Sequence, residues 1–409
     1  MLKVLLGQVK EFKKNSLLAP LFMVLEVSME LIIPVMMASI IDNGVEKGNM
    51  AHVCLIGAIM LIVATMSLTF GVQSGKHAAR ASTGFARNLR MAMFENIQNY
   101  SFSNIDKYST AGLVTRLTTD ITNVQNSYQM IIRLCVRAPI MLIGAMIMTF
   151  SINSKLALIF LGAIIFLSIA LILIMSKVHP IFMKVFKKYD NLNASVQENI
   201  NGIRVVKAYV REDFEIKKFH KASDNIYKLF VKAEKVLILN TPAMFLAMYS
   251  SIILLSWLGA KMIVGGSLTT GELMSLFSYV TNILISLMMI SMMFVMIIMS
   301  RASAERIVEV IEEKSDLTNG ENPDKEILDG SIEFKDVNFS YKKDSENYVL
   351  RNINLKINSG ETIGIIGGTG SAKSSLVQLI PRLYDTSTGT VLVGGKDVRS
   401  YDIESLRNA

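Results

Sequence analysis

The residues best suited to chemistry lie near the end of the sequence, in the stretch GIIGGTGSAKSSL at 364–376. Its small residues leave backbone N–H groups open to an approaching anion, and Lys373 adds a positive charge beside them. The Ser374 hydroxyl can ligate Mg²⁺, and the spacing follows the phosphate-binding pattern GxxxxGK[ST]. The stretch therefore predicts a site for the phosphates of a nucleotide. The alternative is a glycine-rich turn that binds nothing.

Ala372 is the one departure from this pattern, because it replaces the second glycine. A Cβ there costs about 1–2 kcal/mol if the backbone needs a positive φ, and almost nothing if the backbone is helical. The lysine, the hydroxyl and most of the N–H groups stay in place in either case. We therefore expect a nucleotide to bind with normal or reduced affinity.

A phosphate loop of this kind has to lie between a strand and a helix. The residues before it, ETIGIIG (361–367), are typical of a strand, and SSLVQLIPRLYD (374–385) is typical of a helix. Two further strand-like pieces, at 331–341 and 350–357, follow a polar, turn-rich segment at 318–330. These elements predict the beginning of an α/β domain.

The remainder of the chain has the composition of a membrane protein. Hydrophobic residues make up 51% of the sequence, charged residues only 19%, and the mean hydropathy is +0.41, which together exclude an ordinary soluble enzyme. Six apolar runs are long enough to cross a hydrocarbon core of about 30 Å. They lie near 16–41, 51–74, 129–151, 156–176, 242–264 and 273–300.

The distribution of basic residues predicts how these spans are oriented. Four lysines precede the first run, six Lys/Arg lie in 75–128 and thirteen lie in 177–240, whereas the intervening connections hold only Lys47 and Lys155, with Lys261 at an edge. The positive-inside rule therefore places the N-terminus and the two long connections in the cytoplasm. The net charge of +8 then reflects membrane topology, and we expect no nucleic-acid partner.

The two long cytoplasmic connections lack the Gly/Pro/Ser clusters of a loose linker, so we expect each to be a pair of long helices. In the first, Phe85, Leu89 and Met93 recur every four residues and form one apolar stripe. The expected tips lie at 100–110 and 208–215. They are either solvated hairpin ends or levers that touch a cytoplasmic domain.

Several segments together resemble one known family. The resemblance is carried by QENINGIRVVKAYVREDFEIKKF (197–219), SRASAERIVEVIEE (300–313), VNFSY (337–341) and VLVGGKDVRSYDIESLR (391–407), besides the phosphate loop and the six spans. The chain resembles a half-transporter of the ATP-binding cassette (ABC) exporter family, of the bacterial multidrug and lipid type. The fold class implied is a multi-domain membrane protein, with a six-helix α transmembrane domain at 1–315, a linker at 316–330 and the N-terminal part of an α/β P-loop nucleotide-binding domain at 331–409.

This resemblance implies ATP and Mg²⁺ as cofactors, and Tyr341 as the aromatic side chain that stacks on the adenine. The expected nucleotide-binding residues are Tyr341, Gly367, Gly368, Thr369, Gly370, Ser371, Ala372, Lys373, Ser374 and Ser375, with Ser374 as the Mg²⁺ ligand. The expected partners are a second half-transporter, identical or not, and the lipid bilayer of the cell membrane. The hairpin tips at 100–110 and 208–215 resemble the family's coupling helices.

The function implied is ATP-driven export of a hydrophobic or amphipathic substrate, such as a drug, lipid or peptide. Two other functions stay open, a non-hydrolysing nucleotide-binding subunit of a heterodimer, favoured by Ala372, and a membrane channel or scaffold with a regulatory nucleotide-binding domain. The family's glutamine loop, signature, Walker B carboxylates and switch histidine do not occur before Ala409. We therefore expect no catalytic residue in this chain and interpret it as an N-terminal fragment or truncated product of a longer protein.

Charges inside the spans are the sequence's best indication of a substrate cavity. Glu26 and Glu30 are one helical turn apart in the first span, and Arg133 and Arg137 have the same spacing in the third. Charges in lipid are expected to face the interior and pair. They form either a structural ion-pair ladder or an acidic cavity wall for cationic drugs.

A methionine stripe in the last span is the second candidate for a cavity wall. Met288, Met292 and Met296 recur every four residues on one helix face. Methionine adapts its shape to different contacts, which suits a cavity that accepts many substrates. Packing against lipid or another helix explains the same stripe equally well.

Overall fold

The computed structural model describes residues 1–341 and 347–409, apart from the side chains of 186, 190, 294, 295, 298 and 299. The described chain divides into two compact units. One comprises Glu11–Ser82 and Asn126–Met299 and is called the membrane unit below. The other, the hairpin-and-sheet unit, comprises Met1–Lys10, Thr83–Gln125 and Ser300–Ala409.

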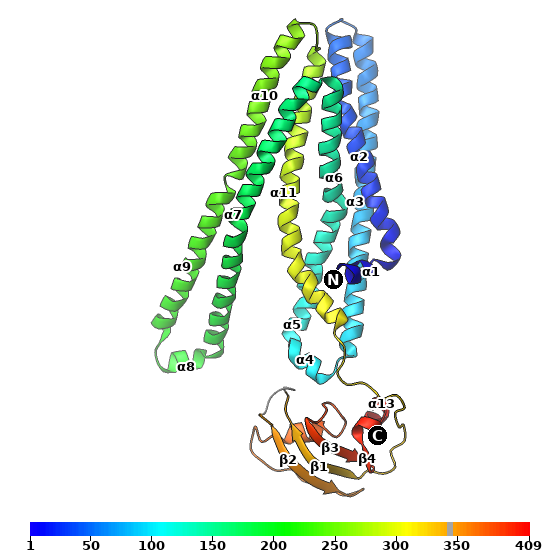
Figure 1. Ribbon diagram of the computed structural model, residues 1–409, viewed down its shortest axis with the longest axis vertical. Coiled ribbons are helices and arrows are strands. Elements are labelled where there is room, and N and C mark those ends of the chain that lie inside the picture. The colour runs from blue at the N-terminus through cyan, green and yellow to red at the C-terminus, as the bar shows by residue number, and fades with distance from the viewer. Residues whose placement is uncertain (342–346) are drawn as a thin grey trace. The chain divides into compact units, whose positions relative to one another are not determined.

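Six helices are long and apolar enough to cross a membrane, which confirms the six expected spans (Figure 1). They belong to α2 (Lys13–Ser39), α3 (Met50–Gln98), α6 (Ile121–Ile152), α7 (Ser154–Asn201), α10 (Asn240–Val264) and α11 (Thr270–Glu312). Several continue well past the length of a span, since α3 has 49 residues and α7 has 48. Long helices thus replace loose loops in both long connections.

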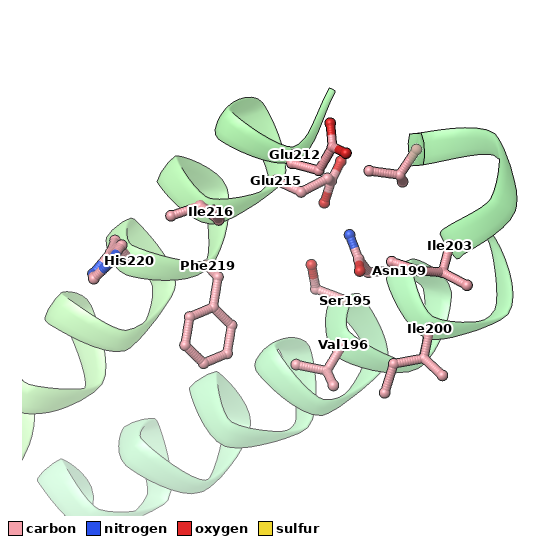
Figure 2. A pocket seen from close by; sticks show the side chains of 11 residues that line it. Ser195, Val196, Asn199, Ile200, Ile203, Glu212, Glu215, Ile216, Phe219 and His220 are labelled. Carbon is pink, nitrogen blue, oxygen red and sulfur yellow. The ribbon is translucent and has the colours of Figure 1, made fainter. Parts of the chain in front are cut away.

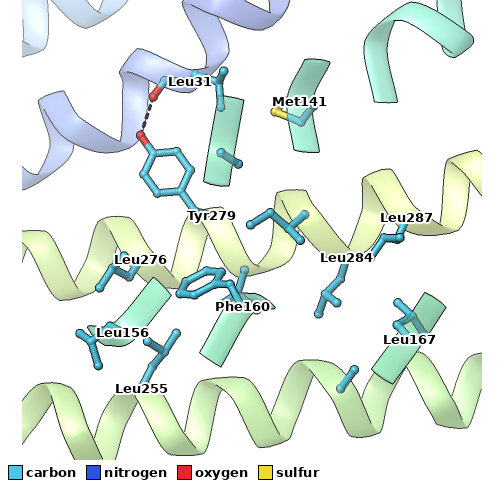
Figure 3. Packing of buried hydrophobic residues seen from close by; sticks show 14 of the residues in the cluster. Leu31, Met141, Leu156, Phe160, Leu167, Leu255, Leu276, Tyr279, Leu284 and Leu287 are labelled. Carbon is cyan, nitrogen blue, oxygen red and sulfur yellow. Dashed lines mark hydrogen bonds between the residues drawn. The ribbon is translucent and has the colours of Figure 1, made fainter. Parts of the chain in front are cut away.

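The core of the membrane unit lies where α2, α6, α7, α10 and α11 converge. Phe160 of α7, Leu255 of α10 and Leu276 of α11 are fully buried there (Figure 3). Tyr279 of α11 is also buried and donates a hydrogen bond of 2.6 Å to the Leu31 carbonyl of α2. Lipid is as apolar as these side chains, so close packing and such hydrogen bonds must hold the helices together.

A second set of contacts joins α2 and α11 at the ends next to the 269–271 turn. Asp42, in the π-helical turn η2 (Ile40–Val45), accepts hydrogen bonds from the Thr269 hydroxyl at 2.6 Å and from the Gly271 backbone N–H at 2.7 Å. Gly271 lies so close to α2 that a Cβ there would collide with the Ala38 backbone. The glycine is therefore required by close helix approach.

Each long connection ends in short helices. The first contains α4 (Phe102–Tyr108), α5 (Thr110–Thr115) and the π-helical turn η3 (Arg116–Asp120). The second contains α8 (Ile203–Ala208) between α7 and α9 (Glu212–Leu237), which lie side by side (Figure 1). Near the N-terminus, α1 (Leu2–Gly7) and η1 (Lys10–Phe12) precede α2.

Residues after α11 form a small antiparallel sheet in the order β2-β1-β3-β4. The strands are β1 (Ile332–Phe339), β2 (Leu350–Ile357), β3 (Thr388–Val393) and β4 (Lys396–Asp397). Phe334 and Phe339 of β1, Val391 of β3 and Tyr401 pack into one buried cluster. The short helices are α12 (Lys373–Gln378), η4 (Val398–Ser400) and α13 (Ile403–Asn408).

The expected elements on either side of the phosphate loop differ in the structure. Residues 361–367 are not a strand, because no strand of the described sheet pairs with them, and Ile366 is 98% exposed. An apolar segment without a hydrogen-bonded neighbour has no ladder to hold it extended. The following helix, α12, has only six residues and ends before Pro381, which lacks the N–H needed to continue it.

Candidate nucleotide site

The phosphate loop adopts a left-handed conformation at two positions, Gly370 with φ of 85° and Ala372 with φ of 59°. Glycine takes this conformation freely, but an alanine costs about 1–2 kcal/mol. Of the two possibilities that the sequence left open for Ala372, the structure has the strained one. Gly367 is constrained in another way, because a Cβ there would lie 2.6 Å from the Ser371 hydroxyl.

Lys373, the first residue of α12, folds its side chain back over the loop. Its Nζ donates hydrogen bonds of 2.8 Å to the carbonyls of Gly367 and Gly368 and one of 3.2 Å to the Ser371 hydroxyl. An ammonium group has three N–H donors, and all three are used here. The positive charge therefore lies over the exposed loop residues 367–370, including Thr369, which are open to an anion.

The two serines that follow face different surroundings. Ser374 is exposed, whereas Ser375 is 5% exposed and its hydroxyl lies 2.8 Å from the Tyr341 hydroxyl. Ser374 thus has the accessible oxygen that a metal ion requires. The Ser375 hydroxyl instead links α12 to Tyr341, the residue expected to stack on the base.

Tyr341 lies in an aromatic cluster that brings the end of β1 next to the segment after α12. Its ring packs edge-on against Phe339 at 4.8 Å and against Tyr384 at 5.2 Å between centroids. It stays 45% exposed, which leaves part of the ring open to a base. Tyr384 was not among the residues singled out from the sequence, because its place beside Tyr341 depends on the turn at residues 379–382.

Tyr384 also contacts the tip of the first hairpin. Its hydroxyl donates a hydrogen bond of 2.8 Å to Asp106 of α4, and Phe102 packs beside its ring at 6.0 Å. Burial, together with the hydrogen bond to Asp106, raises the pKa of the Tyr384 hydroxyl. A cavity of about 270 Å³ opens beside these rings and is lined also by Ser103 and Leu317.

Glu313, the residue that follows α11, lies in a polar cluster with side chains of the same hairpin tip. The Glu313 carboxylate accepts hydrogen bonds from Lys107 at 2.8 Å, Tyr108 at 2.6 Å and Asn104 at 2.9 Å. The hydrogen bonds from Lys107 and Tyr108 hold the pKa of this carboxyl below its ordinary value. The Ser101 hydroxyl of the tip likewise donates a hydrogen bond to the Asp316 carboxylate.

Comparison with known proteins gives two family matches. Residues 16–288 match the ABC transporter transmembrane region, and residues 350–409 match the ABC transporter domain. The uncharacterised ABC transporter ATP-binding protein YfiB of Bacillus subtilis is 34% identical over 97% of this chain and 69% of its own length. This chain belongs to the ABC transporter family.

Other relatives are ABC transporters too. An uncharacterised ABC transporter ATP-binding protein of Mycobacterium tuberculosis is 32% identical over all of this chain and 71% of its own length. An ATP-dependent lipid A-core flippase of Desulfotalea psychrophila is 29% identical over 85% of this chain and 61% of its own length. With its six apolar helices, this ABC transporter is a multi-pass membrane protein related to exporters, and its cassette domain implies ATP binding.

In the membrane unit of this ABC transporter, Arg137 holds both glutamates of the first span. Its Nη1 lies 2.8 Å from Glu26 Oε1, and its Nη2 lies 2.8 Å from Glu30 Oε2. Arg133, which has the same helical spacing, makes neither contact, and its Nε is buried without a hydrogen-bond partner among the described residues. The charges therefore form a three-residue bridge between α2 and α6.

The methionine stripe of α11 is only partly covered. Met288 is 44% exposed, Met292 is 66% exposed, and Met296 is partly buried. Their role as a cavity wall stays a prediction.

The tip of the second hairpin carries a pocket of its own, of about 500 Å³ (Figure 2). Ile203, Ile216 and Phe219 form apolar walls where α7, α8 and α9 meet, and the carboxylates of Glu212 and Glu215 lie at one side. Neighbouring Val210 has a positive φ of 52°, which is rare for a β-branched residue. This tip is thus both apolar and conformationally strained.

Proposed function

We propose that this ABC transporter is one half of a dimeric exporter that uses ATP to move a hydrophobic or amphipathic molecule across the cell membrane. The observation that carries the proposal is the position of Lys373 over an open, glycine-rich loop, on the same chain as six membrane spans. Relatives described as an ATP-dependent lipid A-core flippase and a putative export ATP-binding/permease protein support export.

The proposed nucleotide site uses the amides of 367–371, the Lys373 ammonium and the half-exposed ring of Tyr341. Mg²⁺ is proposed to bind the exposed Ser374 hydroxyl, which is a suitable oxygen ligand beside triphosphate oxygens. Hydrolysis also needs a positioned water and a second protein surface over the γ-phosphate, so we propose that those groups come from outside the loop described above. The domain limits at 315 and 330 likewise stay a prediction.

The experiment measures binding of labelled ATP to the full-length protein in detergent, with millimolar Mg²⁺. Replacing Lys373→Ala removes the only side-chain charge placed over the described loop, and we expect binding to weaken at least tenfold. Lys356→Ala, an exposed lysine on β2 away from the loop, is the matched control and is expected to bind as the parent does. Equal binding by both variants would contradict the proposed site.

The proposed orientation puts the N-terminus and both hairpin tips in the cytoplasm. In a background without Cys54 and Cys135, Lys47→Cys should react with a membrane-impermeant maleimide on intact cells, whereas Tyr209→Cys should react only after the cells are opened. The reverse order would show that the topology is inverted.

Ala372 supports a second function, a subunit that binds ATP without hydrolysing it and relies on a competent partner. The strained φ at this position favours it, because a cost of about 1–2 kcal/mol disfavours the loop conformation. Steady-state ATP hydrolysis by the full-length protein, purified without any other subunit, distinguishes the two. If the parent protein hydrolyses ATP and Lys373→Ala does not, the result supports a homodimeric exporter. If the parent protein binds ATP but does not hydrolyse it, the result supports the second function.

A further inference from the structure

The cavity of about 270 Å³ beside Tyr341 is small enough to restrict what it can hold. All the residues that line it belong to the hairpin-and-sheet unit. Tyr341 and Tyr384 form one corner, with ring centroids 5.2 Å apart and ring planes at 87°. A flat molecule that stacks on one ring therefore meets the edge of the other. Pockets for drug-sized ligands measure about 300–1,000 Å³, so this cavity suits a single flat ring system.

The cavity lies within reach of the phosphate loop. The Tyr341 hydroxyl lies 2.8 Å from the Ser375 hydroxyl, and Ser375 follows Lys373 by two residues of α12, which is about 3 Å along the helix. The ring of Tyr341 runs from this hydroxyl to the wall of the cavity. A nucleotide whose phosphates lie at the loop can therefore place its base here.

The polar lining of the cavity is rich in hydrogen-bond acceptors. Asp316 and Asp385 line it, and none of the described lining residues is a lysine or an arginine. The Asp385 carboxylate is held by the Arg382 guanidinium at 2.8 Å. Asp316 accepts hydrogen bonds from the hydroxyls of Ser101 and Ser103. A carboxylate has about four acceptor positions, so Asp316 is fixed by these contacts and still able to accept from a ligand.

We propose that Asp316 recognises the base of the bound nucleotide, by accepting a hydrogen bond from the exocyclic amine of an adenine stacked on Tyr341. A base without an amine at this position offers the carboxylate no donor. A carbonyl oxygen at the same position would place one acceptor against another. The inference rests on the proposed nucleotide site and adds to it a residue that determines specificity.

The same contact makes base recognition depend on the first hairpin. Ser101 is the N-cap of α4, and Ser103 lies in the first turn of that helix. Both hydroxyls donate to the same oxygen of Asp316, Oδ1. The two serines are thus positioning residues, and Asp316 is oriented toward the base only while the tip is in place.

The test compares ATP with purine riboside triphosphate, which lacks only the exocyclic amine. Equilibrium binding of each to the full-length protein is measured in detergent with millimolar Mg²⁺. The phosphates and the flat ring are shared, so the ratio of the two affinities isolates the amine. We expect the parent to bind ATP about tenfold more tightly, near the low end for a hydrogen bond to a charged group, because Asp316 is exposed.

Three variants locate this preference. Asp316→Ala should abolish it by weakening the binding of ATP alone. Asp316→Asn keeps an oxygen for the two serines but removes the charge. Because charge-assisted hydrogen bonds are roughly twice as strong as neutral ones, its preference should fall to about threefold. Asp336→Asn, at an exposed aspartate of β1 that does not line the cavity, is the matched control and should keep the full preference. If Asp316→Ala does not fold, Asp316→Asn decides.

Three outcomes overturn the inference. The first is equal binding of the two nucleotides by the parent, and the second is a preference for ATP that survives in the Asp316 variants. The third is tighter binding of GTP than of ATP that Asp316→Ala abolishes, since the carboxylate would then recognise the donors of guanine. Equal binding by the parent that is still weakened in Lys373→Ala would refute the base contact alone. Binding of neither nucleotide would refute the proposed site itself.

Discussion

The hydroxyl of Tyr384 donates a hydrogen bond of 2.8 Å to the Asp106 carboxylate, although the two residues are 278 positions apart in the chain. Tyr384 packs against Tyr341 on one side and Phe102 on the other. The first hairpin tip is therefore joined, through one aromatic ring, to the residue proposed to stack on adenine. We expect a displacement of Tyr341 on nucleotide binding to be transmitted to α4 through Tyr384.

Tyr384→Phe removes this hydrogen bond and keeps the ring. The bond is at the surface, so we expect a loss of only about 1 kcal/mol in stability. ATP binding should be unchanged, whereas ATP-driven transport should fall several-fold because the contact to α4 is weakened. Filter binding and vesicle uptake measure the two. Tyr348→Phe, a tyrosine outside the cluster, is the control, and equal transport by both variants would refute the proposed path.

Glu313→Gln tests the polar cluster at the end of α11 through its pH dependence. Because the pKa of Glu313 is lowered in the folded protein, its contribution to stability is complete above the ordinary value of about 4.3 and is lost as the pH falls below it. We expect the variant to be less stable by about 1.5 kcal/mol at pH 7, and the difference should shrink as the pH falls through the lowered pKa of Glu313.

The measurement for this prediction is thermal unfolding of both proteins from pH 7 to pH 3 in one detergent. Other carboxylates titrate equally in both proteins and cancel in the difference. A difference that is constant across the whole range, or that grows toward low pH, would show that the Glu313 charge does not stabilise the tip.

Ala372→Gly tests the strained residue of the phosphate loop. Glycine relieves about 1–2 kcal/mol of left-handed strain but gives back about 0.4–1 kcal/mol through the freer unfolded chain. We expect a net stabilisation of up to about 1.6 kcal/mol and tighter ATP binding. Gly368→Ala serves as a comparison, since a Cβ there meets nothing within 4 Å. Weaker ATP binding by Ala372→Gly than by the parent would contradict this account of the loop.

Arg137→Met leaves two carboxylates close together in the membrane unit without a counter-charge. The three side chains are partly buried, and charges left without a partner at membrane depth are costly, so we expect the protein to misassemble. The triple variant Arg137→Met, Glu26→Gln, Glu30→Gln should recover assembly, because no charge is then left unpaired. Size-exclusion chromatography reports assembly. Failure of the triple variant would mean that the charges themselves are needed.

The sequence predicted the six spans because a run of about 20 apolar residues has few other stable environments. It also predicted the family, since several separate segments resemble the same architecture. It could not predict that Arg137 binds both glutamates and Arg133 neither. The two arginines have the same spacing in the sequence, and only the rotation of α6 against α2 distinguishes them.

The phosphate loop shows the same division in one short segment. Residue types and spacing predicted a phosphate site at 367–374, because small residues, a lysine and a hydroxyl offer the groups that bind phosphates. The sign of φ at Ala372, the lack of a strand at 361–367 and the contact from Tyr384 to Asp106 were decided only by the tertiary structure. Each depends on which distant segment packs beside the residue, and the local sequence does not determine which segment that is.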